Sequence, residues 1–267
     1  MGMPCWLRLW DNMETEGKYI YCIIETKLER NFGPIGIGEK GNEVLTIGYD
    51  DLSMVVSNYP ITRITATKES MLTHQKVIEK VMTEFDSVLP VRFGTLACSA
   101  EEIRNLLDRR YREFKNALKD LDHKIELGVK GAWKNIDAIF GEIIRENKDI
   151  GRLKEEIGND ADKRNTEAKI DVGKRVQRAL QTKKETEAET IVDALRRTAF
   201  DHKLNRTMCD EMFMNAAFLV DKGREKEFDN IMNDLSDDYK DRIRFMYAGP
   251  LPVFNFVNIV IYPETWE

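Results

Sequence analysis

The sequence has little cysteine and little proline, and it lacks a long hydrophobic run that could cross a membrane. It holds 4 Cys and 7 Pro in 267 residues. A long uncharged stretch that includes residues 246–263 is interrupted by Gly249, Pro250 and Pro252, so it predicts a turn and a strand rather than a spanning helix. Residues 1–12 contain one basic residue and no extended apolar core, so they do not resemble a secretion signal. These absences favour a cytoplasmic protein.

A basic surface and a cysteine framework are also missing. Asp and Glu number 47 against 41 Lys and Arg, a net charge of -6, which gives no global signal for binding nucleic acid or anionic membranes. The cysteines are Cys5, Cys22, Cys98 and Cys209. Their wide spacing excludes the paired pattern of a zinc site and a dense disulfide framework. We therefore expect reduced, mostly buried thiols, no metal site and no cofactor.

The first half of the chain has the pattern of an α+β domain. Alternating or apolar segments predict strands at residues 18–26, 44–49, 52–59 and 88–94. Residues 18–26 are apolar on both faces, with Tyr19, Tyr21 and Ile23 on one and Ile20, Cys22 and Ile24 on the other, which is typical of a central strand. Two amphipathic helices are predicted after Thr67 and after Ser99. Helices should therefore cover one sheet.

The second half repeats this character around a highly charged segment. Strands are predicted at residues 122–130, 211–220, 242–248 and 253–262, and helices at about 133–143 and 228–235. Between them, residues 142–206 are rich in charges of both signs and contain no proline, which favours exposed helices with a break near residues 158–160. This segment is interpreted either as a solvated face or as an arm that contacts a partner.

Two runs are specific enough to indicate a family. They are residues 89–95 (LPVRFGT) and 249–257 (GPLPVFNFV), and weaker matches follow the same order at residues 19–25, 36–57, 74–79, 126–130 and 215–220. Through these runs the chain resembles the gas vesicle protein F/L family from about residue 18 to 257. The tail departs from the family pattern at Val253 and Phe254, where the family usually has Pro and Tyr. That change puts a hydrogen bond of the tail in doubt.

The resemblance implies an α+β fold with two ferredoxin-like α/β-sandwich domains, a charged helical hairpin inserted in the second, and an extended C-terminal tail. The expected boundaries are an N-terminal extension at 1–17, domains at 18–120 and 121–248, a helical insertion at about 145–205, and a tail at 249–267. Residues 1–12 lie outside the resemblance.

The resemblance also implies a function. It indicates a non-enzymatic minor structural or assembly protein of gas vesicles, whose partners are the small hydrophobic gas vesicle wall protein A and other accessory proteins. Catalytic residues, metal ligands, nucleic acid and membranes are not implied. The expected structural motif residues are Pro90, Arg92, Phe93, Gly94, Gly249, Pro250, Pro252 and Phe256. The expected partner contacts are Arg196, Arg197, Phe254 and Phe256.

An alternative is a ligand-binding regulator or an enzyme with a pocket near His74 and Arg92. His74 lies on the apolar face of its helix, so a general base is conceivable, but a hydrogen-bonded core histidine is the favoured interpretation. Arg92 lies in a predicted strand between apolar residues, where a guanidinium must be paired. An ion pair is favoured there over anion recognition.

Overall fold

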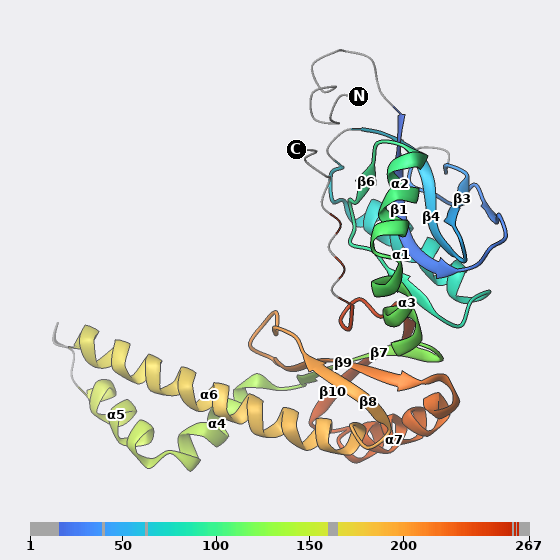
Figure 1. Cartoon of the computed structure of the whole chain (residues 1–267). Helices are drawn as coiled ribbons and strands as arrows, with labels where there is room; N and C mark the ends of the chain where they lie inside the picture. The colour runs from blue at the N-terminus through green and yellow to red at the C-terminus, as the bar shows by residue number, and fades with distance from the viewer. Residues whose placement is uncertain are drawn as a thin grey trace. The chain divides into compact units, whose positions relative to one another are not determined.

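The chain forms two compact units, each with its own sheet and helices (Figure 1). The computed structural model describes residues 16–38, 41–61, 64–159, 165–257, 259 and 261. Unit 1 comprises residues 1–126 and 250–267, and unit 2 comprises residues 127–249. The predicted α+β class is confirmed, and unit 2 is an insertion in the sequence of unit 1. Residues 1–12, including Cys5, lie outside the described part.

Unit 1 is built on an antiparallel sheet with β1 near its centre. Its strands are β1 (Glu16–Glu25), β2 (Asn31–Gly33), β3 (Val44–Tyr49), β4 (Leu52–Pro60), β5 (Val88–Pro90) and β6 (Leu96–Ala97). The order is β2-β3-β4-β1-β5, and β6 also pairs with β1. Asp50 adopts the left-handed conformation (φ 53°) in the tight turn between β3 and β4. The central position explains why β1 is apolar on both faces.

A β-bulge in β1 decides which side chains face which helix. The register against β4 shifts between Ile20 and Cys22, and the extra residue breaks the strict alternation of faces. Tyr19 and Tyr21 therefore share one apolar cluster with Cys22 and Ile24. The predicted separation of these residues onto opposite faces is wrong for this reason.

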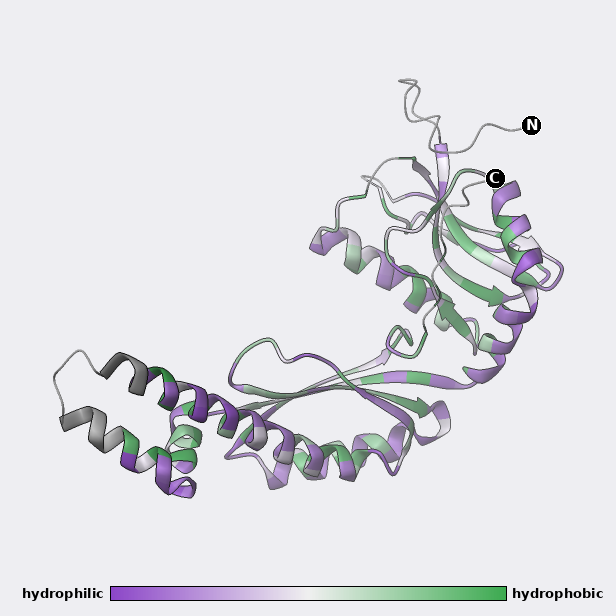
Figure 2. Ribbon diagram, turned by 60° about the vertical axis from the view of Figure 1, so that its left-hand side comes forward, coloured by the Kyte–Doolittle hydropathy of each residue, from purple (hydrophilic) through white to green (hydrophobic). Residues whose placement is uncertain are grey.

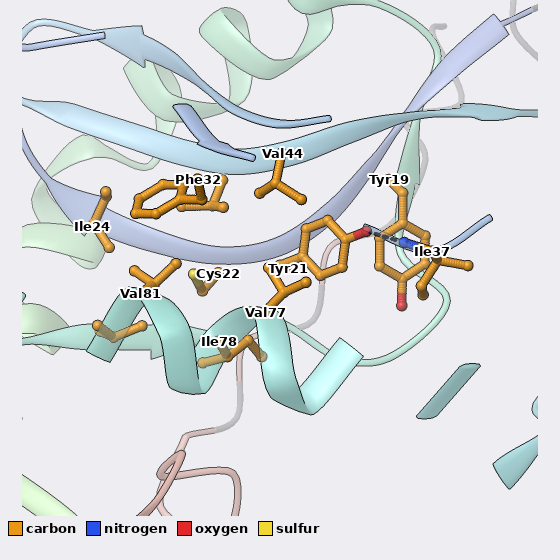
Figure 3. Packing of buried hydrophobic residues seen from close by; sticks show 12 residues of the cluster. Tyr19, Tyr21, Cys22, Ile24, Phe32, Ile37, Val44, Val77, Ile78 and Val81 are labelled. Carbon is orange, nitrogen blue, oxygen red and sulfur yellow. Dashed lines mark hydrogen bonds between the residues drawn. The ribbon is translucent and has the colours of Figure 1, made fainter. Parts of the chain in front are cut away.

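Helices cover both faces of the unit 1 sheet. The helix α1 (Lys68–Met82) begins at Thr67, whose side chain accepts a hydrogen bond from the Ser70 amide. It packs on one face, while α2 (Ala100–Arg109) and α3 (Tyr111–Asp120) lie on the other (Figures 1 and 2). The single helix predicted after Ser99 is thus two helices that meet at Arg110. Figure 3 shows Val77, Ile78 and Val81 of α1 against β1.

Unit 2 has the element order of a ferredoxin-like domain. Its strands are β7 (Lys124–Trp133), β8 (Ala199–Leu204), β9 (Met212–Asp221) and β10 (Ile243–Leu251), and its helices are α4 (Ile136–Glu146), α5 (Lys148–Asn159), α6 (Asn165–Leu195) and α7 (Glu225–Asp238), with a short 3-10 turn, η2 (Lys222–Arg224). The sheet order is β10-β7-β9-β8, the arrangement expected for strand, helix, strand, strand, helix, strand. Unit 1 differs, because four of its strands precede its first helix.

Two predicted features of the second half differ from the structure. The charged segment contains the predicted helices, but it ends in β8, which the helix-rich composition concealed. The tail strand predicted at 253–262 does not form in its described part. Instead, Pro252 and Val253 accept hydrogen bonds from the amides of Phe254 (2.7 Å) and Phe256 (3.0 Å), which closes a turn. Pro252 breaks the pairing here because it cannot donate a backbone hydrogen bond.

An ion network joins the elements of unit 2. Arg242 forms paired hydrogen bonds with Glu142 of α4 (2.7 and 2.9 Å) and contacts Glu187 of α6 (2.6 Å). The indole of Trp133 in β7 also donates to Glu187 (2.6 Å). Lys183 bonds Glu142 at 3.0 Å. Because of these cations, chiefly Arg242, the pKa of Glu142 falls to about 2. The network therefore fastens two helices to the sheet.

Candidate functional site

The two sequence runs that indicate the family meet in unit 1. Residues 88–97 pair with β1 twice, as β5 and as β6, and bow away between them. Two hydrogen bonds to β1 hold the ends of the arch. The Val91 amide donates to Tyr21 O (2.9 Å), and Thr95 O accepts from the Ile20 amide (3.0 Å). His74 of α1 contacts Phe93 in this arch and Phe254 in the tail. The candidate site is therefore the cluster of Tyr19, Tyr21, His74, Phe93 and Phe254, called here the His74 cluster.

Both ring nitrogens of His74 are engaged. Nε2 lies 3.1 Å from Val91 O, which can only accept, so Nε2 carries the proton. Nδ1 then accepts from the Tyr19 hydroxyl at 2.8 Å. The same hydroxyl accepts from the Gly94 amide at 3.1 Å. This chain of hydrogen bonds fixes one tautomer and leaves no free nitrogen to act as a general base.

Burial keeps the ionisable groups of the cluster neutral. His74 is 2% exposed, and burial lowers its pKa to about 4, although the bond to Val91 opposes this shift. Burial also raises the pKa of Tyr19 and of Tyr21. The Tyr21 hydroxyl is held by Ser57 Oγ at 2.8 Å. It also accepts from the Ile37 amide at 2.8 Å (Figure 3). The cluster is thus built for packing and orientation rather than proton transfer.

Aromatic rings enclose the imidazole on several sides. Tyr21 and Phe254 lie nearly parallel to it, with centroids at 5.6 and 6.0 Å, and Phe93 meets it edge-on at 5.7 Å. Phe254 is 38% exposed, so it caps the cluster toward solvent. This contact needs an aromatic ring and no hydroxyl, so a phenylalanine at position 254 is sufficient for it.

Glu126 anchors the tail beside the cluster. Its carboxylate accepts from the Asn255 amide (2.9 Å) and from the Asn255 side chain (2.6 Å). Glu126 is buried, as are Pro252 and Val253. A buried carboxylate requires such donors because desolvation disfavours its charge. The anchor therefore positions Phe254 over His74.

The structure places the other expected motif residues differently. Pro90 is buried in β5, whereas Arg92 is exposed in the arch. The prediction of a buried, paired Arg92 is wrong because residues 91–95 form the arch and not a continuous strand. With Arg92 at the surface and both His74 nitrogens engaged, these two residues do not form the alternative ligand pocket.

The remaining predicted residues are divided between the units. Gly249 and Pro250 extend the edge strand β10, and Phe256 is half-buried in the tail. Arg196 and Arg197 are exposed in unit 2, directly after α6. Arg196 pairs with Asp193 at 3.2 Å, and the Arg197 carbonyl accepts from Arg224. The four expected partner contacts therefore do not form one cluster within a unit.

Gly94 supplies a backbone conformation that other residues rarely adopt. Its φ is +85°, and a Cβ there would meet nothing within 4 Å. Gly94→Ala should therefore cost about 1–2 kcal/mol through backbone strain alone. The matched control is Gly141→Ala in α4, also without a neighbour within 4 Å. It should stabilise by about 0.5–1 kcal/mol. Urea unfolding of both variants checks the pair, and equal effects would contradict the assigned role of Gly94.

Cysteine, metal and membrane expectations have separate outcomes. Cys22 and Cys209 are free thiols, but Cys98 is disulfide-bonded, so the expectation of reduced thiols is wrong for Cys98. Within the described ranges, no group of three or more His, Cys, Asp or Glu is suited to hold a metal ion. Nor does any helix described there combine the length and apolar character of a membrane span.

Sequence reasoning missed Glu126 and the role of Tyr19. The available signal for Glu126 was a carboxylate inside an otherwise apolar strand, ELGV, which requires a buried donor. Tyr19 gave no such signal, because its hydroxyl partners come from residues 74 and 94, far along the chain.

Comparison with known proteins agrees with the resemblance found in the two sequence runs. The family model described as "Gas vesicle synthesis protein GvpL/GvpF" matches residues 17–258. The chain is 27% identical over 253 residues to gas vesicle protein F1 of Halobacterium salinarum, covering 94% of this chain and 97% of that protein. The crystal structure of GvpF from Anabaena sp. PCC7120 superposes with a TM-score of 0.77 at 21% identity, covering 92% of this chain and 100% of that chain. GvpF from Microcystis aeruginosa gives 0.76 at 22% identity, covering 91% and 99%.

Proposed function

The chain belongs to the GvpL/GvpF family of gas vesicle synthesis proteins, and from that membership we propose that it is a non-enzymatic assembly protein that binds the small hydrophobic gas vesicle wall protein. A subunit apolar enough to line a gas space tends to aggregate in water. A binding protein can prevent this by covering the apolar surface until the subunit is incorporated.

One observation carries the proposal: unit 2 displays large apolar side chains on one edge of its sheet. Phe200, Leu204 and Met208 are 76%, 60% and 82% exposed. They lie on β8 and on the loop that follows it. Grouped apolar exposure of this kind is typical of protein interaction surfaces. Arg196, one of the expected partner contacts, lines a groove together with Leu204 and Met208.

The His74 cluster supports a structural role for the family runs. A neutral histidine with both nitrogens engaged and a tail fixed by Glu126 are features of a scaffold. Phe254 and Phe256, which belong to unit 1, remain predicted contacts.

The proposal is tested by co-expressing the wall protein with the affinity-tagged full chain. We expect the wall protein to be captured with the chain and its soluble fraction to rise at least fivefold over expression alone, because its apolar surface is covered. Capture and the supernatant fraction are measured by immunoblot. An unrelated acidic protein with the same tag is the control. Wall protein that pellets equally with and without the chain would contradict the proposal.

A further inference from the structure

The edge strand β8 is the part of unit 2 that is open to another strand. Among the described strands it pairs with β9 alone, at the end of the sheet order. An edge strand presents unpaired backbone groups that can template a further strand. The opposite edge, β10, contains Gly249 and Pro250, and proline cannot donate to a ladder. The two edges are therefore not equivalent.

The backbone donors of β8 alternate between its two sides. The Asn205 amide donates to Asn215 O (2.7 Å) toward β9, so by antiparallel alternation the amides of Leu204 and His202 point outward. The Asp201 carboxylate accepts from the His202 amide at 2.8 Å. A charged side chain of this kind limits indiscriminate pairing at an edge. The Leu204 amide continues the same outward row.

A groove of about 880 Å³ runs beside β8. One wall is α6, and the other is formed by β8, the following loop and the start of β9. Four buried apolar residues contribute to its lining: Ala188, Val192, Phe213 and Met214. Leu204 and Met208 line it as well and are largely exposed. An extended segment along β8 could place alternate side chains on this apolar surface.

The charges on the α6 wall define what such a segment must carry. Glu185 and Glu189 are exposed one helical turn apart, and like charges at this spacing destabilise a helix. Two basic groups nearby are bound to other partners and not to these glutamates. Lys184 is buried and donates to Cys209 O (3.1 Å), and Arg196 pairs with Asp193. Asp210 in the loop lies 3.9 Å from the Lys184 ammonium, so among the lining residues Arg206 alone offsets the two charges of Glu185 and Glu189. A basic side chain facing α6 would relieve the repulsion between Glu185 and Glu189.

We propose that the β8 edge and this groove, together the β8 groove, bind an extended apolar segment with basic residues from the wall protein, which adds as a further strand to β8. The inference rests on the proposed function and specifies its surface. Main-chain hydrogen bonds to β8 supply affinity, and the apolar lining with Glu185 and Glu189 supplies selectivity.

The test uses the full chain in the capture experiment, with two variants that act by different means. Leu204→Pro removes an outward amide that the β8–β9 ladder does not use, and the double variant Glu185→Lys/Glu189→Lys reverses charge on the exposed wall of α6. Each should lower the captured wall protein at least tenfold. The matched control is Met246→Asp on the opposite edge, β10, where Met246 is 42% exposed. It should capture as the wild type does.

The outcomes separate the two proposals. Capture by the wild type and by both β8 groove variants would overturn the β8 groove while keeping the proposed function. No capture by the wild type would overturn the proposed function and this inference with it. If Leu204→Pro lowers the melting temperature, the double variant on the solvent face of α6 decides alone, and its undiminished capture would overturn the β8 groove.

Discussion

Arg242→Ala should lower the free energy of unfolding by about 2–3 kcal/mol. The substitution leaves Glu142 and Glu187 without the guanidinium that both contact, at 2.7 and 2.6 Å. Removing one partner of a partly buried ion pair costs more than the pair contributes, since the remaining carboxylates stay desolvated. The Arg242 side chain is 35% exposed, so water screens part of the penalty and the effect falls below that of a fully buried pair. Urea unfolding followed by circular dichroism measures it.

The matched control for Arg242 is Arg175→Ala on α6. Arg175 pairs with Asp171 at 2.8 Å one helical turn away, with both side chains about half exposed. Such a pair contributes about 0.3–0.5 kcal/mol. If the two variants lose the same stability, the network does not fasten α4 and α6 to the sheet.

Acidification from pH 7 to pH 5 should cost the folded chain about 2 kcal/mol through His74. In the folded state its pKa is about 4 against an ordinary 6.5, so at pH 5 the unfolded chain binds a proton that the folded chain does not. Stability therefore rises with pH across this range. The contribution of the neutral His74 is fully present above pH 6.5 and is lost as pH falls toward 4. Urea unfolding at pH 7, 6 and 5 measures the slope.

Two variants isolate the histidine responsible. His74→Gln should be less stable at pH 7, yet it should lose little further stability down to pH 5. His123→Asn changes a side chain that is 60% exposed, and it should retain the wild-type slope. Tyr19 and Tyr21 do not contribute, because burial raises the pKa of each. A slope that survives in His74→Gln would assign the pH dependence to another group.

The elements that the sequence predicts well are those with local causes. Thr67 starts α1 because its side chain accepts a hydrogen bond from the Ser70 amide three residues later. Only residues 50 and 51 separate the strands predicted at 44–49 and 52–59, and a tight turn at Asp50 joins β3 to β4. The buried face of α1 contains His74, as its predicted place on the apolar face requires, together with Val77, Ile78 and Val81, whereas Met71 is 51% exposed.

The features that sequence reasoning missed depend on distant parts of the chain. The short strand β8 directly follows α6 and has exposed side chains at most positions, so it lacks the alternation that identifies strands. Pairing with β9, and not its own composition, makes it a strand. The arch at residues 91–95 is likewise fixed by Tyr19, Tyr21 and His74, and this context overrides the strand propensity of LPVRF. The His74 cluster could be predicted only in part, as a hydrogen-bonded core histidine.

Because unit 2 is inserted in the sequence of unit 1, the ribosome makes the two segments of unit 1 at different times. Residues 250–257 leave the ribosome only after the whole of unit 2, so unit 1 is made without Phe254 over His74 and without Asn255 on Glu126. Domains fold largely in the order of synthesis, and here the first domain begun is the last completed. A nascent chain that stops within unit 2 therefore lacks the ring that covers His74 and the donors that Glu126 requires.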